Sequence, residues 1–174
     1  RVSLFVVVFV AIGMGLLVGY HLAVDSAANR RYLTVVALHT AWLLELVGDR
    51  ATMAETDQGP RVAFVLKEGA AFSFIVVPEC GAIEVMVIFL AGVVAFPAGW
   101  RARLLGLAVG LPVLYGVNVL RLSCLGVVGA VDGGGRWFEF CHRYVWQSVY
   151  IIFVVMVWLV WIEYVVRRRG RPAW

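Results

Sequence analysis

The sequence lacks the short motifs that mark many soluble enzymes. It contains no CxxC, no HExxH and no GxSxG. Its three histidines and three cysteines do not fall at the spacings of metal ligands. No low-complexity tract, internal repeat or linker rich in proline, glycine and serine interrupts the chain. We therefore expect a single integral domain over residues 1–174, with no metal and no cofactor.

Charge is also scarce. Charged residues make up 15% of the chain and hydrophobic residues 63%, whereas a soluble domain is about 45–50% apolar. The mean hydropathy is +0.91. The net charge of +4 does not indicate nucleic-acid binding, because four arginines gather in the C-terminal tail. The composition predicts an all-α polytopic membrane protein whose partner is the lipid bilayer.

Five apolar stretches are candidates for membrane-spanning helices, since about 20 residues cross the hydrocarbon core. The segment 48–79 holds two β-prone runs on either side of Lys67, Glu68 and Gly69, which predicts a small β-hairpin or, alternatively, an irregular loop. The chain begins at Arg1 without a methionine, so we expect residues to precede it. The expected spans are about 2–23, 32–47, 80–100, 104–131 and 145–166.

Basic residues in short loops predict the orientation, because such loops collect on the cytoplasmic side. With five spans, three basic segments fall on one side, and the segments 48–79 and 132–143 fall outside. The C-terminus is then cytoplasmic. The basic residues are Arg30 and Arg31, Arg101 and Arg103, and the tail residues Arg167, Arg168, Arg169 and Arg171.

Three chemically capable side chains are expected at one depth near the outer face. Cys80 stands at the mouth of the third span, and His142 precedes the fifth. Arg121 lies in the fourth span, 18 residues beyond Arg103, or roughly 27 Å along a helix. A charge within a span costs at least about 2.5–3.5 kcal/mol and usually faces a partner in the protein. Asn118, three residues earlier, shares its face.

These residue types can perform acyl transfer. A thiolate is a strong nucleophile, an imidazole can carry a proton, and a guanidinium can hold an oxyanion. Each also has an ordinary structural explanation. The cysteine can be a small core residue, the histidine an interfacial polar group, and Arg121 a clamp to Glu84 or Asn118. Cys141 is a rival nucleophile, and Cys124 and Cys141 can either pair or pack.

At these residues the sequence resembles the exosortase/archaeosortase family of membrane transpeptidases. The family pattern is a Cys at the start of one span, Asn-x-x-Arg within the next, and a His before the following one. The matching residues are Cys80, Asn118 with Arg121, and His142. The stretches CGAIEVMVIFLAGVVAFPAGWRARLLGL, NVLRL and FEFCHRYVWQ look like the exosortase H subtype. The resemblance covers about residues 74–166. Members usually carry Cys-x-Gly, whereas this chain reads Cys-Gly-Ala.

The resemblance implies a multi-pass enzyme of the bacterial inner membrane with its active site facing the periplasm. It implies cleavage of C-terminal signals that consist of a short motif, a membrane helix and an Arg-rich tail. The protein would then pass through a thioester to an acceptor, such as a lipid-linked amine. Alternatives are a hydrolase that uses water, or a non-catalytic subunit with a structural Arg121–Glu84 pair. The expected roles are Cys80 as nucleophile, His142 as acid and base, Arg121 as oxyanion ligand, Asn118 as the group that orients it, and Glu84 and Glu79 as supporting residues.

Overall fold

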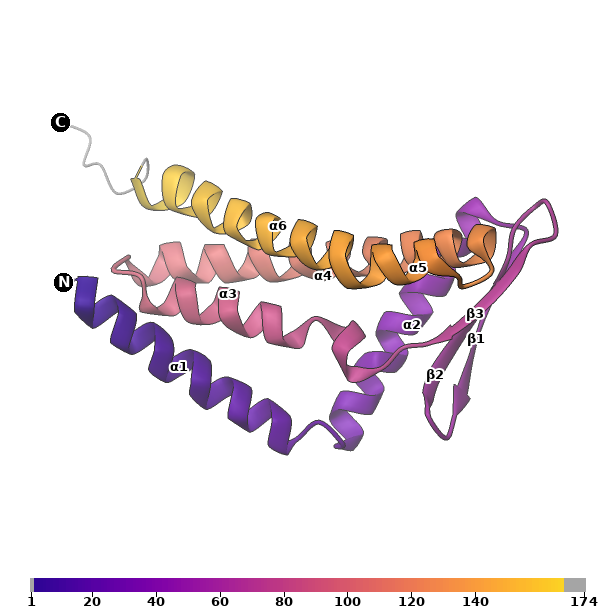
Figure 1. The fold of residues 1–174 in the computed structure, drawn as a ribbon. Coiled ribbons are helices and arrows are strands. Elements are labelled where there is room, and N and C mark those ends of the chain that lie inside the picture. Colours follow the sequence, from indigo (N-terminus) through magenta and orange to yellow (C-terminus); the bar gives the residue numbers. More distant parts are fainter. Residues whose placement is uncertain (1, 168–174) are drawn as a thin grey trace. The chain divides into compact units, whose positions relative to one another are not determined.

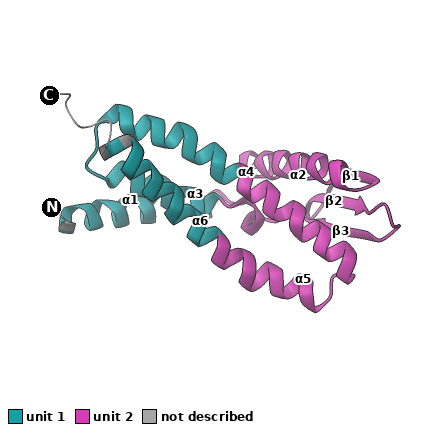
Figure 2. Cartoon of the chain, turned by 90° about the horizontal axis from the view of Figure 1, so that it is seen from above, with its two compact units in different colours: residues 1–22, 83–115, 150–174 teal, residues 23–82, 116–149 magenta. Residues whose placement is uncertain are grey.

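The computed structural model describes residues 2–167, which form helices and one small sheet (Figure 1). The chain divides into two compact units, coloured separately in Figure 2. Unit 1 holds residues 1–22, 83–115 and 150–174, and unit 2 holds residues 23–82 and 116–149. The single integral domain expected from the sequence stays a prediction.

The elements follow one another in a helix–sheet–helix order. The first part comprises α1 (Val2–Leu22), α2 (Ala27–Val47), β1 (Arg50–Thr56), β2 (Gly59–Val65), β3 (Ala71–Ile75) and the 3₁₀ turn η1 (Pro78–Gly81). The second part comprises α3 (Ile83–Ala95), α4 (Trp100–Asp132), α5 (Arg136–Phe140), the π-helical turn η2 (Cys141–Val145), α6 (Trp146–Trp161) and the π-helical turn η3 (Ile162–Arg167).

Three helical stretches within residues 2–167 are long and apolar enough to cross a membrane. They are Ser3–Leu22, Trp100–Asp132 and Arg136–Tyr164. This supports a mostly helical membrane protein, but the expected count of about five spans is not confirmed. The third expected span corresponds to α3, an apolar helix of only 13 residues, whereas about 20 residues cover the hydrocarbon core.

The second expected span corresponds to α2, which covers the sheet. Ser26 caps its first turn, because its Oγ accepts a hydrogen bond from the Asn29 amide at 3.2 Å. One face of α2 packs on β1 and β2. The helix ends at Val47, and a Cβ on the capping residue Gly48 would collide with the ring of Phe64. The buried residues of α2 are Asn29, Leu33, Val36, Ala37, Thr40, Ala41 and Leu44.

The expected hairpin is confirmed as β2 and β3, and a further strand extends it. The Leu66 amide donates to the Ala70 carbonyl at 2.8 Å and closes the turn between β2 and β3. Strand β1 pairs antiparallel with β2, so the sheet order is β1-β2-β3. The β1–β2 turn is tight, with Gly59 at a positive φ of 127°. The sequence of β1, RATMAET, lacks the alternation of apolar residues that indicates a strand.

In unit 1 the helices alternate in direction. At one end the rings of Phe5 and Phe96 lie 6.1 Å apart, and Trp161 Nε1 donates to the Ala102 carbonyl at 2.8 Å. At the other end His21 Nε2 lies 3.5 Å from a Glu84 carboxylate oxygen. There Tyr150 also donates its hydroxyl proton to the Leu114 carbonyl at 3.0 Å. The pairs α1–α3 and α4–α6 are therefore both antiparallel in this unit.

This alternation has a consequence for membrane topology. The chain leaves unit 1 after Leu22 and returns at Ile83, and the His21–Glu84 contact places both points at one end of the unit. Residues 23–82 thus start and finish at the same end. If unit 1 crosses the bilayer, the end of α1 and the start of α3 lie on one side of it, and the loop between α3 and α4 lies on the other. The sequence had placed the end of the first span and the start of the third on opposite sides. Residues 168–174, with most of the basic tail, lie outside the described residues.

We expect a cysteine introduced at Asp25, three residues after α1, to react with a membrane-impermeant maleimide from one side of sealed vesicles. Gly99→Cys, in the loop between α3 and α4, should react only from the opposite side. Both positions are exposed. The measurement uses a background without the three native cysteines. Labelling of Asp25→Cys from the side of Gly99→Cys would restore the orientation expected from the arginines.

Candidate functional site

The four residues of the family pattern all lie in unit 2. Cys80 belongs to the turn η1, Asn118 and Arg121 belong to α4, and His142 belongs to η2. They come from three separate stretches of chain. The fold of one compact unit therefore brings together the cysteine, amide, guanidinium and imidazole groups that the sequence singled out.

Cys80 sits in a turn that precedes a helix. Pro78 opens the 3₁₀ turn, and the Cys80 amide donates to the Val77 carbonyl at 2.8 Å. Ala82 follows with a φ of 56°, in the left-handed region. This region costs a non-glycine residue about 1–2 kcal/mol, and the family pattern Cys-x-Gly has its glycine at this position. Helix α3 begins only at Ile83, later than the expected start of the third span at Cys80.

The Cys80 thiol is shielded from solvent, with 7% of the residue exposed. Burial raises the pKa of this thiol, and the Glu79 carboxylate raises it further. A hydrogen bond with the Val77 backbone and the positive charge of Arg121 lower the pKa, but burial prevails. At neutral pH the resting group is therefore a protonated thiol, and its use as a nucleophile requires a base.

Asn118 holds the turn that carries the thiol. The side chain is fully buried, and its Nδ2 donates to the Cys80 carbonyl at 2.7 Å. Its Oδ1 lies 3.5 Å from Nη1 of Arg121, which is long for a hydrogen bond. The expected role of Asn118 in orienting the arginine stays a prediction, and the short bond to Cys80 was not anticipated.

Arg121 is a buried cation with few partners. Only 8% of the residue is exposed, and its Nε has no hydrogen-bond acceptor. Within residues 2–167 no carboxylate forms an ion pair with it. The charge acts electrostatically on both Cys80 and His142. A guanidinium buried without an anion is unfavourable by itself, so this position can accept negative charge from a bound or reacting group.

The sheet positions His142. Its imidazole stacks on Phe138 with centroids 5.9 Å apart and planes 7° apart. Phe138 in turn packs on Phe72 of β3 at 5.1 Å. Around His142 the helix widens, because the Trp146 amide bonds to the Cys141 carbonyl five residues earlier. Such π-turns are frequent at functional sites.

No hydrogen bond joins Cys80 to His142 in the part of the chain that the structure describes. Among residues 2–167, Arg121 alone interacts electrostatically with both groups. Catalytic hydrogen bonds are often long or unformed before substrate binds. The structure therefore places a thiol, a cation and an imidazole in one unit, and their roles stay predictions.

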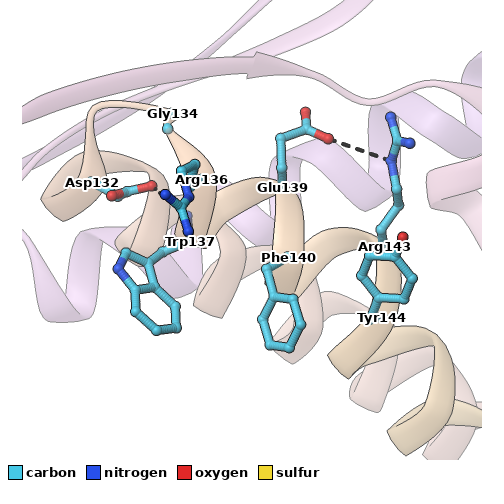
Figure 3. A pocket seen from close by; sticks show the side chains of 9 residues that line it. Asp132, Gly134, Arg136, Trp137, Glu139, Phe140, Arg143 and Tyr144 are labelled. Carbon is cyan, nitrogen blue, oxygen red and sulfur yellow. Dashed lines mark hydrogen bonds and ion pairs between the residues drawn. The ribbon is translucent and has the colours of Figure 1, made fainter.

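A groove of about 1120 Å³ lies along α5 and η2, the segment that also carries His142 (Figure 3). It is lined by Trp137, Phe140 and Tyr144 and by the exposed ion pair of Arg143 with Glu139 at 3.4 Å. Asp132 caps α5 by accepting from the Trp137 and Phe138 amides. His142 does not line the groove.

The remaining predicted residues are dispersed. Glu84 lies in unit 1 beside His21, and its pairing with Arg121 stays a prediction. Glu79 lies in the turn next to Cys80. Cys124 and Cys141 are both free thiols.

One contact had no signal in the sequence. The hydroxyl of Tyr32, on α2, donates to the Gly81 carbonyl at 2.6 Å. In the sequence Tyr32 merely opened an expected membrane span. Its contact with the Cys80 turn depends on α2 packing beside η1, a long-range arrangement that no local pattern reveals.

Comparison with known proteins gives one distant similarity. The chain is 29% identical over 108 residues to Archaeosortase A of Haloferax volcanii. The match covers 62% of this chain and 34% of that protein, so it spans about a third of the relative's length. No family model matches the sequence, and no solved structure matches it. The similarity supports the exosortase/archaeosortase family and a membrane transpeptidase character, but not the exosortase H subtype.

Proposed function

We propose that this chain is a membrane cysteine transpeptidase that cleaves C-terminal sorting signals and transfers the protein to an acceptor through a thioester on Cys80. The proposal rests mainly on the buried Arg121 cation, which interacts electrostatically with a buried cysteine and with a histidine yet has no carboxylate partner within residues 2–167. A purely structural arginine in a protein interior is normally paired.

The first half of the reaction forms the acyl-enzyme. The Cys80 thiol gives its proton to the imidazole of His142, and Sγ attacks the carbonyl carbon of the scissile peptide. Arg121 donates hydrogen bonds to the resulting oxyanion. The carbon–nitrogen bond then breaks, and His142 returns the proton to the leaving amine. A thioester on Cys80 remains.

The second half releases the product. An acceptor amine attacks the thioester carbonyl and gives its proton to His142, and Arg121 again holds the oxyanion. The carbon–sulfur bond breaks and Cys80 takes back the proton. A lipid-linked amine would leave the protein attached to the membrane, whereas water would make the enzyme a hydrolase.

The substrate class follows from the family resemblance and from the membrane setting. A signal with a membrane helix and an Arg-rich tail would insert with the tail in the cytoplasm. Its recognition motif would then emerge at the outer face of a bacterial inner membrane, where the proposed site faces the periplasm. Glu79 and Glu84 are proposed to support the site, and Asn118 to orient Arg121.

Hydroxylamine should capture the thioester, which the transpeptidase and the hydrolase share, and so test for the acyl-enzyme. We expect the purified protein, given a native protein that ends in an apolar helix and an Arg-rich tail, to yield a hydroxamate at the new C-terminus. Mass spectrometry of that terminus measures the outcome. A free carboxylate at every hydroxylamine concentration would contradict the thioester intermediate, and an uncleaved substrate would contradict both enzymatic readings.

A further inference from the structure

We propose that Tyr32 is a positioning residue for the nucleophile, whose hydroxyl clamps the turn that carries Cys80 and so fixes the direction of the thiol. This inference deepens the proposed function and rests on it for its catalytic meaning. The clamp itself is a property of the fold.

The clamp consists of two donors on successive carbonyls. Asn118 Nδ2 binds the Cys80 carbonyl at 2.7 Å, and the Tyr32 hydroxyl binds the Gly81 carbonyl at 2.6 Å. The donors come from different helices, α4 and α2. Because a peptide unit is planar, a carbonyl held in place also fixes the orientation of its neighbours. Two consecutive peptide planes beside the thiol are thereby fixed from two directions.

The ring of Tyr32 contributes as well as its hydroxyl. A Cβ on Gly81 would lie 3.1 Å from Cε1 of Tyr32 and 3.2 Å from Cδ2 of Leu33, closer than ordinary contacts. Gly81 therefore lies directly against α2. This close approach explains why a glycine follows Cys80 in this chain.

The turn needs such support because it is not a low-energy conformation. Ala82 adopts a φ of 56°, and a residue with a side chain holds that conformation only when its surroundings impose it. The turn is also short, with four residues between Val77 and Ala82. Without the Tyr32 bond, the Gly81 peptide can rotate and the thiol can leave its buried position.

The test compares Tyr32→Phe with Tyr150→Phe. Each substitution removes one phenol-to-carbonyl hydrogen bond and keeps the ring, but Tyr150 bonds to Leu114 in unit 1. We expect Tyr32→Phe to lower kcat for signal processing about tenfold with KM unchanged. We also expect iodoacetamide to alkylate Cys80 three- to tenfold faster, measured on the Cys80 peptide by mass spectrometry. Tyr150→Phe should match the wild type in both.

The alkylation rate keeps the clamp separate from the proposed function. If the wild-type protein processes no signal, the proposed function fails, while faster alkylation of Tyr32→Phe still supports the clamp. Alkylation of Tyr32→Phe at the wild-type rate overturns the clamp, whatever happens to processing. Both tyrosine variants should lose a little thermal stability, because each loses a hydrogen bond. Comparing Tyr32→Phe with Tyr150→Phe separates this common effect from the effect of the clamp.

Discussion

Cys80→Ala is expected to abolish signal processing, with no product above the uncatalysed background. The substitution removes the only atom in the proposed mechanism that bonds covalently to the substrate. Losses of about 10⁴-fold or more are ordinary when a catalytic nucleophile is deleted. Quantitative mass spectrometry of the processed C-terminus measures the effect. The variant should still fold, because the side chain removed is small.

Two matched controls come from the same chain. Cys124→Ala and Cys141→Ala remove the other thiols, both of which are free in the structure. Each should retain processing within a few-fold of the wild type. Cys141 is the sharper control, since it adjoins His142 in η2. If Cys141→Ala is inactive and Cys80→Ala is active, the nucleophile has been misassigned.

The sequence singled out candidate site residues, but it missed part of the architecture around them. Cys80, Arg121 and His142 were expected at a common depth, and all three lie in unit 2. That expectation was available because a thiol, a cation and an imidazole are conspicuous among apolar residues. The precise start of α3 was missed, because the left-handed Ala82 separates the turn from the helix.

The role of α2 could not be deduced from composition. A helix that covers a sheet and a helix that faces lipid are both rich in apolar residues, and only packing distinguishes them. Val36 and Leu44 are fully buried in this unit, whereas Leu38 and Trp42 on the same helix are exposed. The contact of Tyr32 with Gly81 depends on that packing. It therefore became visible only with the fold.

Strand β3 shows a similar dependence. Its apolar residues predicted a strand, and the strand is present. Its function in positioning was not predicted, since Phe72 reaches Phe138 and thereby the imidazole of His142 only through tertiary contacts. A Cβ on Gly129 of α4 would collide with the Phe72 ring. Gly129 is thus needed for Phe72 of β3 to lie against α4.

Arg121→Met separates catalysis from stability. We expect processing to fall about 10²–10³-fold, the usual effect of removing one oxyanion ligand. Thermal stability and membrane abundance should stay the same or rise. Methionine is apolar and of similar length, and replacing a buried charge that lacks an anion removes a desolvation cost. Processing assays and a thermal-unfolding scan of the purified protein measure the two effects.

The non-catalytic alternative predicts the opposite sign for stability. If Arg121 formed a structural pair with Glu84, Arg121→Met would remove that pair, and abundance and unfolding temperature would fall together. Glu84→Gln is the matched control. If Arg121 and Glu84 form a pair, Glu84→Gln should lower the unfolding temperature as much as Arg121→Met does. If Glu84 instead contacts His21, Glu84→Gln should leave the unfolding temperature unchanged and processing within a few-fold of the wild type.

Arg121→Lys refines the result, because lysine restores the charge but not the forked donors of the guanidinium. Partial recovery of processing with Arg121→Lys would mean that the charge alone carries part of the effect, and a destabilised Arg121→Met with normal specific activity would rule out the oxyanion role.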